Sequence, residues 1–149
     1  MTTTLIRSEK IHPRILLFAT LIVAALSSVV QAHAQSSLLD AKVFVANAGE
    51  KGKAADEKGD VITFRNGTFH SSMCDQWGYG KGNYTAIAEG DAVQFETETT
   101  SEKDGRLAWH GMVKGDTIEG VFTHYRKPKW YNKNPAPIEH WFKGKLKQS

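Results

Sequence analysis

Apolar and polar residues alternate along most of the chain after residue 38, which is the period-two pattern of half-buried β-strands. Three two-residue turns interrupt this alternation, at Asn66-Gly67, Gly90-Asp91 and Gly115-Asp116. Such residues are typical of tight hairpin turns because they tolerate the left-handed backbone found there. The pattern therefore predicts an antiparallel meander of hairpins, with no helical periodicity after residue 34.

Eight strands are predicted from the alternating runs. They are 39–45, 60–65, 68–73, 83–89, 92–99, 105–114, 117–126 and 138–147. Residues opposite one another across a hairpin share a face of the sheet, which fixes the register. This rule pairs Phe64 with Phe69 and places Gly111 opposite Gly120, where crowding or strong bending would require small residues.

Each strand has one hydrophobic face and no helix is predicted to cover it. Closure of the meander into an eight-stranded barrel, with the last strand paired to the first, best satisfies this pattern. A small β-sandwich is the alternative. Because neighbouring strands alternate in direction, the three tight turns lie at one end of the barrel. The long connections 46–59, 74–82, 100–104 and 127–137 lie at the other end, where we expect a binding site.

The first 34 residues have the features of a secretory signal peptide. Basic residues precede an apolar run over 15–30, and Ala32-His33-Ala34 is typical of a cleavage site. The run is shorter than the roughly 20 residues of a spanning helix, although retention as a membrane anchor is the alternative. We expect cleavage near Ala34, a single domain over 35–149, and a periplasmic or secreted protein.

Charge and cysteine content narrow the classes of function. Of nineteen Lys and Arg and sixteen Asp and Glu, three and one lie in residues 1–34, which leaves 16 − 15 = +1 for residues 35–149. Net charge therefore gives no argument for nucleic-acid binding. Cys74 is the single cysteine, so no intramolecular disulfide can form. It is either a small buried hydrophobe or a reactive or ligating thiol.

The hairpin layout and the segment from Lys114 to Phe122 resemble the small lipocalin-like, or calycin-type, β-barrels. The chain also resembles a group of small exported bacterial proteins of unassigned function. The shared positions are Phe69, Cys74, Gly78, Tyr84, Trp109, Gly111, Gly115, Asp116, Gly120, Trp141, Phe142 and Gly144. The chain is shorter than true lipocalins and lacks their Gly-x-Trp motif. The resemblance implies ligand binding and brings no catalytic motif with it.

A lining of aromatic and polar residues is predicted inside the barrel near its long-loop end. Its members are Tyr84, Thr97, Trp109, His124 and His140. Trp, Tyr and His combine apolar faces with polar atoms, which suits a small aromatic or amphipathic ligand. The alternative is that these side chains simply fill the barrel and bond one another or buried water.

Two long connections add aromatic residues that could close over the barrel mouth. Trp77 and Tyr79 lie in a glycine-rich segment, and Trp130 lies in a segment of alternating basic, aromatic and proline residues over 126–137. The basic segment could bind anionic polysaccharide, phospholipid headgroups or single-stranded nucleic acid. Export makes nucleic acid the least plausible of these partners. A solvated loop that caps the lumen is the alternative.

Metal binding and catalysis find little support in the sequence. His124, His140 and Cys74 could meet at the mouth, but no spacing motif for a metal accompanies them. His70 and Ser71 are consecutive in a strand and point to opposite faces, which prevents a direct catalytic pair. We expect neither a resident metal or cofactor nor an enzymatic activity.

A second surface is predicted on the outside of the barrel. An outward apolar stripe is expected at Met112, Val121, Tyr125 and Trp141. Such a stripe could serve a homodimer or another protein partner. The sequence thus predicts an exported barrel that binds a small hydrophobic or amphipathic molecule at the long-loop mouth. The alternative is a non-enzymatic envelope protein that binds a protein or an anionic polymer through its outer surface.

Overall fold

The computed structural model describes residues 38–56 and 58–148. The predicted signal peptide over 1–34 and its cleavage site lie outside these residues. The strands and the one short 3₁₀-helix are β1 (Val43–Glu50), β2 (Asp60–Arg65), β3 (Thr68–Ser71), η1 (Ser72–Trp77), β4 (Gly82–Glu89), β5 (Ala92–Ser101), β6 (Gly105–Lys114), β7 (Thr117–Arg126) and β8 (Ile138–Leu146).

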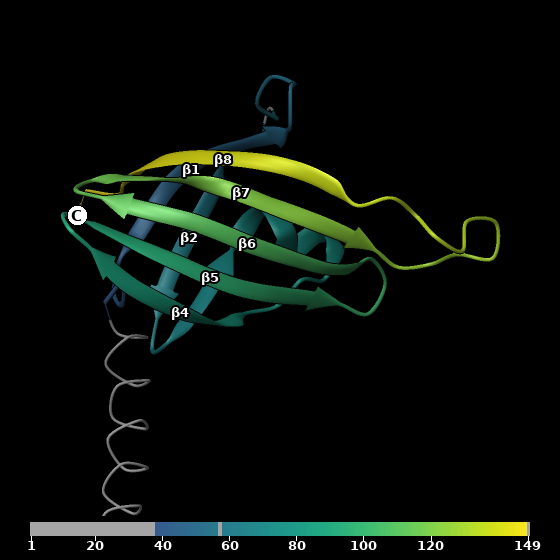
Figure 1. Cartoon of the computed structure of the whole chain (residues 1–149), viewed down its shortest axis with the longest axis horizontal. Helices are drawn as coiled ribbons and strands as arrows, with labels where there is room; N and C mark the ends of the chain where they lie inside the picture. Colours follow the sequence, from purple (N-terminus) through teal and green to yellow (C-terminus); the bar gives the residue numbers. More distant parts are fainter. Residues whose placement is uncertain (1–37, 57, 149) are drawn as a thin grey trace, which may run out of the picture. The chain divides into compact units, whose positions relative to one another are not determined.

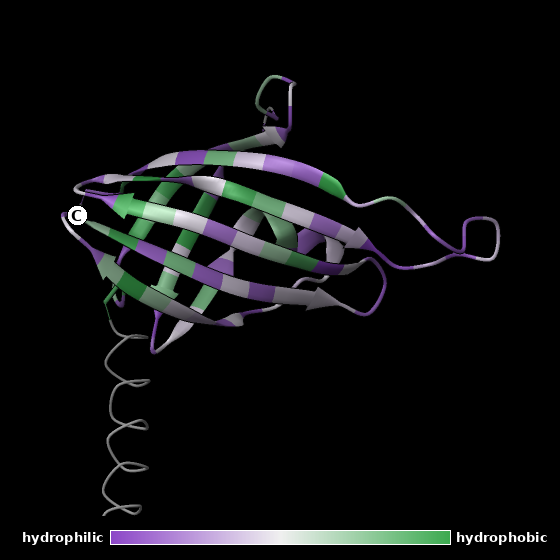
Figure 2. Ribbon diagram, in the orientation of Figure 1, coloured by the Kyte–Doolittle hydropathy of each residue, from purple (hydrophilic) through white to green (hydrophobic). Residues whose placement is uncertain are grey.

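The eight strands form a closed antiparallel barrel in sequence order (Figure 1). The barrel closes where β8 pairs with β1 over seven positions, from Phe44 opposite Leu146 to Glu50 opposite His140. This confirms the predicted barrel and excludes the sandwich. Hydrophobic and polar residues alternate along the strands, as Figure 2 shows. No helix within the described ranges is both long enough and apolar enough to cross a membrane.

The register predicted from the three tight turns is confirmed. Phe64 pairs with Phe69, and Gly111 pairs with Gly120. The turns at 66–67, 90–91 and 115–116 lie at one end of the barrel, as alternating strand directions require. The longer connections lie at the opposite end, and the connection over 127–137 projects well beyond the barrel (Figure 1).

The first strand was predicted too early, because it begins at Val43 and not at residue 39. Leu39 and Asp40 belong to a turn, and Ala41 has a positive φ of 66°, which breaks the extended backbone. The apolar Leu39 is fully buried, so it counts as a core residue without lying in a strand. Its burial explains why alternation alone placed it in the sheet.

This turn closes the tight-turn end of the barrel. The Asp40 carboxylate accepts a hydrogen bond from the Gly67 backbone N–H at 3.0 Å and another from the Tyr84 hydroxyl at 2.8 Å. Burial, with the neighbouring Asp40, raises the pKa of Tyr84, so its hydroxyl stays protonated and can donate. The bonds hold Leu39 in place as a plug.

The third strand is shorter than predicted, since it ends at Ser71 and the chain then turns into η1. The cause is Asp60, a carboxylate only 1% exposed. Asp60 accepts hydrogen bonds from the Met73 N–H at 2.9 Å and the Ser71 hydroxyl at 2.7 Å. A buried carboxylate needs such donors, and they lie on the turn that starts η1.

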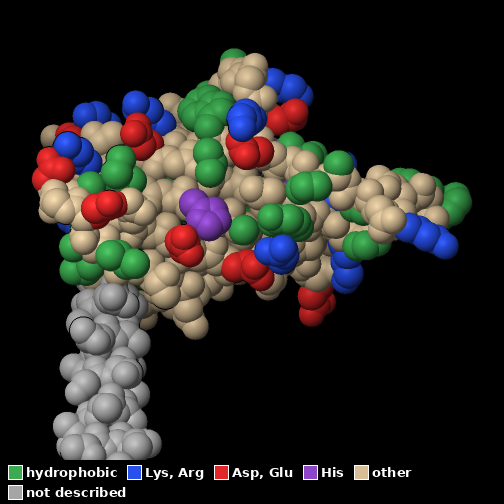
Figure 3. All heavy atoms as spheres, in the orientation of Figure 1, with side chains coloured by type: hydrophobic (Ala, Val, Ile, Leu, Met, Phe, Trp, Pro, Cys, Tyr) green, Lys and Arg blue, Asp and Glu red, His purple; other side chains and the backbone are tan. Residues whose placement is uncertain are grey.

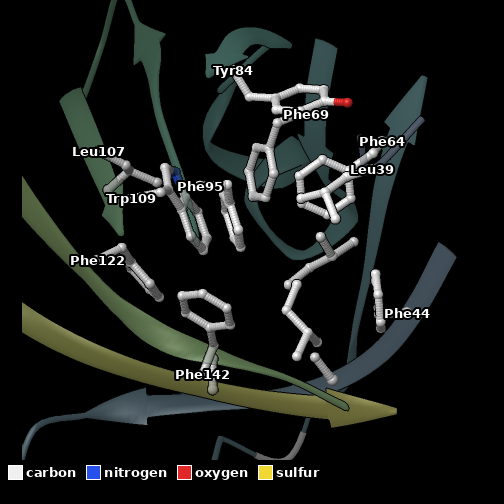
Figure 4. Close-up of a cluster of buried hydrophobic side chains, with 14 of the residues drawn as sticks. Leu39, Phe44, Phe64, Phe69, Tyr84, Phe95, Leu107, Trp109, Phe122 and Phe142 are labelled. Carbon is white, nitrogen blue, oxygen red and sulfur yellow. The ribbon is translucent and has the colours of Figure 1, made fainter. Parts of the chain in front are cut away.

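Aromatic side chains fill the middle of the barrel (Figure 4). Phe95, Phe69 and Phe64 contact one another edge-on or stacked, with ring centroids 5.0 to 5.9 Å apart. Trp109 stacks on Phe122 with centroids 4.2 Å apart. Among the described residues, the side chains of this core lie between Leu39 and Leu146.

The facing pair Gly111 and Gly120 leaves room for this core. A Cβ added at Gly111 would lie 2.5 Å from Phe95 Cε1 and 2.8 Å from Phe142 Cζ. The rings occupy the space where side chains of β6 and β7 would otherwise lie. Crowding is therefore the reason for glycine at this point of the wall.

We expect Gly111→Ala to lower the free energy of unfolding by about 1 to 3 kcal/mol, because overpacking forces the surrounding rings to shift. Gly80→Ala is the control, since nothing lies within 4 Å of a Cβ there. Urea denaturation of both variants and of the parent chain measures the effect. Equal midpoints for Gly111→Ala and the parent would contradict the crowding argument.

Candidate ligand-binding site

A cavity of about 250 Å³ opens at the long-loop end of the barrel. It lies above the aromatic core, and β6, β7, β8, η1 and the adjoining connections contribute its walls. Its lining residues are Asp56, Met73, Cys74, Trp77, Tyr79, Asp104, Leu107, Phe122, His124 and His140. Most of this lining is apolar or aromatic, with two histidines and two carboxylates, a composition usual for small-molecule sites.

The helix η1 supplies one wall of the cavity. Asp60 fixes the start of η1, and the helix then places Met73, Cys74 and Trp77 along the lining. Gly78, with a φ of 75°, ends the helix in the left-handed conformation, and its N–H bonds to the Asp75 carbonyl at 2.9 Å. The chain thus reverses and brings Tyr79 back to the cavity.

His124 and Tyr79 form a polar bridge at the rim. The His124 Nε2 lies 3.0 Å from the Tyr79 hydroxyl and 3.2 Å from the Asp104 carbonyl oxygen. A carbonyl oxygen can only accept, so Nε2 carries a hydrogen and donates. Burial raises the pKa of Tyr79 to about 12, with the Asp104 charge adding to the effect. The hydroxyl therefore stays neutral and closes the bridge as a hydrogen-bonding group.

His140 is the polar residue of the cavity with an unmet bonding requirement. Its ring stacks on Phe122 with centroids 4.6 Å apart and planes 2° apart, which fixes its orientation. Its Nδ1 is buried and has no hydrogen-bond partner among the described residues. Burial lowers the pKa of His140 and the nearby His124 adds to this, while the Ile138 backbone and the charges of Glu50 and Asp56 act in the opposite direction. His140 therefore contributes a neutral imidazole ring to the lining of the cavity.

Cys74 forms part of the apolar lining. It is 3% exposed, and its Sγ lies 3.3 Å from the Ser71 hydroxyl. Burial raises the pKa of the Cys74 thiol to about 12, and the nearby carboxylates of Asp60 and Asp75 add to the shift. A thiolate is the reactive and metal-binding form. The neutral thiol supports the interpretation of Cys74 as a small buried hydrophobe.

Four of the eight predicted binding residues line the cavity. They are Trp77, Tyr79, His124 and His140. Tyr84, Thr97 and Trp109, which were predicted to share this lining, are not among the residues that line the cavity, and each of them already has a hydrogen-bond partner. Trp130 lies in the projecting connection and is 88% exposed.

The partners of these three residues explain their positions. Tyr84 reaches the closed end and donates to Asp40. The Thr97 hydroxyl donates to the Asn83 carbonyl at 2.9 Å, and the Trp109 Nε1–H donates to Thr99 at 3.2 Å. They fill the barrel, as the alternative interpretation of the sequence held. The cavity occupies only the space that remains above them.

Sequence reasoning missed two of the charged lining residues. Asp56 and Asp104 lie in long connections, which carry no periodic pattern that would orient a side chain. The sequence did indicate that both connections lie at the open end of the barrel, and this was the only signal that could have suggested these two residues. Phe122 on β7 and Leu107 on β6 also line the cavity.

The three residues considered as metal ligands, His124, His140 and Cys74, all line the cavity. Among residues 38–56 and 58–148, however, no group of three or more His, Cys, Asp or Glu is arranged to hold a metal ion. His124 is already bonded to Tyr79 and Asp104.

The predicted outer stripe is not continuous. In the register, Val121 lies between His110 and Trp141, and Met112 lies beside Glu119. The Arg106 guanidinium covers the Tyr125 ring at 3.8 Å, and the Trp141 indole N–H donates to the Lys53 carbonyl at 3.2 Å. Charged side chains and one connection thus break up the apolar area.

A comparison of the chain with known protein families, curated proteins and solved structures found no match. The closed antiparallel barrel is consistent with a lipocalin-like fold, and its cavity is the feature from which a function can be argued.

We expect His140 to make stability fall on acidification. Its pKa is lowered in the folded state, so the unfolded chain takes up a proton first as the pH drops below about 6.5. The stability contributed by the neutral ring is present above that pH and is lost as the pH falls through the folded-state pKa. Urea titrations at several pH values should show a weaker pH dependence for His140→Phe than for the parent chain. Parallel curves would contradict the burial of Nδ1.

We also expect Cys74 to be unreactive in the folded protein. With a pKa of about 12 and 3% exposure, the thiol is neither ionised nor accessible at pH 8. Labelling with a disulfide reagent should be slow in buffer and should reach one thiol per chain in denaturant. Immediate labelling in buffer would show that the η1 wall opens readily.

Proposed function

We propose that this protein is a non-enzymatic, lipocalin-like binding protein for a small amphipathic aromatic molecule, held at the long-loop mouth of the barrel. The observation that carries the proposal is the cavity at the end of the aromatic core, which His140 helps to line and whose lining therefore includes a residue with a buried, unpartnered Nδ1. The resemblance of the sequence to small exported lipocalin-like proteins supports binding and export as parts of the same proposal.

The size of the cavity limits the ligand. An apolar cavity of roughly 150 Å³ holds benzene, whereas drug-sized molecules occupy sites of roughly 300 to 1,000 Å³. A volume of about 250 Å³ therefore favours a molecule of one or two rings. A long-chain lipid or a large cofactor would not fit inside the walls.

The chemistry of the wall indicates the functional group of the ligand. A buried polar atom without a partner costs free energy, and a ligand that bonds to it recovers that cost. A hydroxyl group can donate to or accept from the imidazole, whichever tautomer is present. Phe122 and Leu107 supply the apolar contacts, and Trp77 at the rim can cover the ring. A phenol-like molecule meets these requirements.

The non-enzymatic part of the proposal rests on the state of the polar groups. The Cys74 thiol is neutral, and the His124 Nε2 is engaged with a carbonyl and a phenol. Neither is arranged as a nucleophile activated by a base. The hydrogen bonds that Cys74 and His124 make instead hold these side chains in place.

The alternative function, contact with a protein partner through the outer wall, has less support. Val121 and Tyr125 are about 40% exposed, but His110 and Arg106 flank them. An interface core is depleted in charge, and this wall is not.

We expect 1-naphthol to bind at least tenfold more tightly than naphthalene, which has the same rings without the hydroxyl. The Nδ1 of His140 gains a partner only from the former, and satisfying a buried polar group contributes about 1 to 3 kcal/mol. His140→Phe keeps the stacking on Phe122 and removes the nitrogen, so it should abolish the preference. Titration calorimetry of the parent chain, this variant and Trp141→Phe as an outer-wall control measures it.

Native mass spectrometry of the protein from its own source identifies the ligand class. We expect a stoichiometric co-purifying molecule small enough for the cavity. Failure of both naphthalene and naphthol to bind, together with a bare monomer from the source, would overturn the proposed function. A ligand-free dimer that Trp141→Ala dissociates would favour the outer-wall alternative.

A further inference from the structure

The connection between β7 and β8, residues 127–137, projects from the barrel as a hairpin (Figure 1), and two aromatic residues lie at its tip. The Lys129 N–H donates to the Asn132 carbonyl at 2.9 Å, and the Asn132 N–H donates to the Lys129 carbonyl at 2.9 Å. This reciprocal pair makes Trp130 and Tyr131 the two turn residues. We call residues 127–137 the tip hairpin.

The tip aromatics are the feature that structural stability does not explain. Trp130 is 88% exposed and Tyr131 is 66% exposed, although Gly, Asn, Asp and Pro are the usual turn residues. The two rings contact each other edge-on, with centroids 5.4 Å apart and planes at 90°. So much aromatic surface in water is unfavourable unless something else covers it.

The base of the tip hairpin is fixed to the barrel. The Lys127 N–H donates to the Asp104 carbonyl at 3.0 Å, and its Nζ donates to the Glu102 carbonyl at 2.6 Å. The Arg126 guanidinium donates to the Ala136 carbonyl at 3.3 Å across the two arms of the hairpin. Pro128, together with the prolines at 135 and 137, restricts the backbone further. The aromatic tip is therefore held away from the barrel.

The charge of the tip hairpin is positive throughout. It contains Lys127, Lys129 and Lys133 and no Asp or Glu. Lys129 and Lys133 take part in none of the ion pairs found among residues 38–56 and 58–148, whereas Lys114, Lys143 and other wall lysines do. Figure 3 shows basic side chains beside hydrophobic ones near the end of the projection. An anionic surface complements this arrangement.

We propose that the tip hairpin docks the protein on an anionic lipid bilayer, with Trp130 and Tyr131 inserted among the headgroups and Lys129 and Lys133 bound to lipid phosphates. Trp and Tyr prefer the membrane–water interface because one end of each ring system is apolar and the other polar. Basic residues near an anionic leaflet add attraction that screens with salt.

The ring geometry favours a bilayer over an anionic polysaccharide. A polymer that binds by stacking needs aromatic faces aligned along its path. The ring planes of Trp130 and Tyr131 are perpendicular, so the two rings do not present one continuous aromatic surface. They form a compact wedge at the end of the tip hairpin. A wedge of this kind can enter a headgroup layer. The proposal stands independently of the cavity ligand, although docking would bring the cavity mouth, which lies at the same end of the barrel, toward the bilayer.

The test is vesicle flotation with residues 35–149, the chain expected after signal-peptide cleavage, which contains the eight strands of the barrel. We expect binding to vesicles of phosphatidylglycerol and phosphatidylcholine, little binding to phosphatidylcholine alone, and loss of binding in high salt. Trp130→Ala with Tyr131→Ala should weaken binding at least tenfold. The matched control is Val45→Ala with Ile87→Ala, which removes exposed apolar side chains from the barrel wall and should change nothing.

A second pair of variants separates local charge from net charge. Lys129→Gln with Lys133→Gln should weaken vesicle binding about fivefold for each lysine removed. Lys114→Gln with Lys143→Gln lowers the net charge equally and should have a much smaller effect. All variants should keep the thermal unfolding transition of the parent chain.

Depth of insertion gives the decisive readout. Brominated acyl chains should quench part of the tryptophan fluorescence, and Trp130→Phe should remove that part while Trp141→Phe keeps it. Equal vesicle binding by the tip variants and the parent would overturn the proposal. So would tip-dependent binding to lipid-free polygalacturonate without bromolipid quenching, since it would assign the hairpin to an anionic polymer. Naphthol binding is measured without vesicles, so failure of either proposal leaves the other testable.

Discussion

Pairing of the last strand with the first is the constraint on which the structure depends. Once β8 lies against β1, from Leu146 to His140, every strand has a neighbour on both sides and the inward side chains share one lumen. Eight strands enclose a space that side chains can nearly fill. The phenylalanines and Trp109 fill most of it, so the cavity is the remainder at one end.

The two ends of the lumen are closed by different means, and a buried or half-buried carboxylate organises each closure. Asp40 gathers Gly67 and Tyr84 at the tight-turn end, where Leu39 seals the core. Asp60 gathers the residues that start η1 at the other end. At the tight-turn end, Leu39 fills the lumen beside the Asp40 bonds. At the other end, η1 forms one wall of the cavity. The asymmetry gives the barrel a single mouth.

Local pattern determined how much of this could be predicted from the sequence. Period-two alternation and glycine-bearing turns fix pairing over short distances, which is why Phe64 opposite Phe69 and Gly111 opposite Gly120 could be assigned before the structure. Leu39 was misplaced because burial of an apolar residue in a turn has the same sequence signature as burial in a strand. The turn at η1 depends on Asp60, eleven residues before Ser71, and no local propensity reports such a bond.

The candidate site was predictable to the same limited extent. Topology correctly placed His124 and His140 near the mouth, since both lie on inner faces of strands joined by the long connection. It could not show that Trp109, one strand away, stays outside the lining of the cavity and bonds to Thr99. Depth within a barrel depends on strand tilt and stagger, which a list of inward positions does not contain.

The distribution of polar bonds supports the proposal that recognition takes place at this mouth. At the core and the closed end, the buried polar groups of Trp109 and Tyr84 are matched within the chain. At the mouth, His140 keeps a buried nitrogen without a partner, and the tip hairpin keeps two aromatic rings in water. Each of these costs free energy in the isolated chain. The position of both costs at one end of the barrel supports the proposal that ligands are met there.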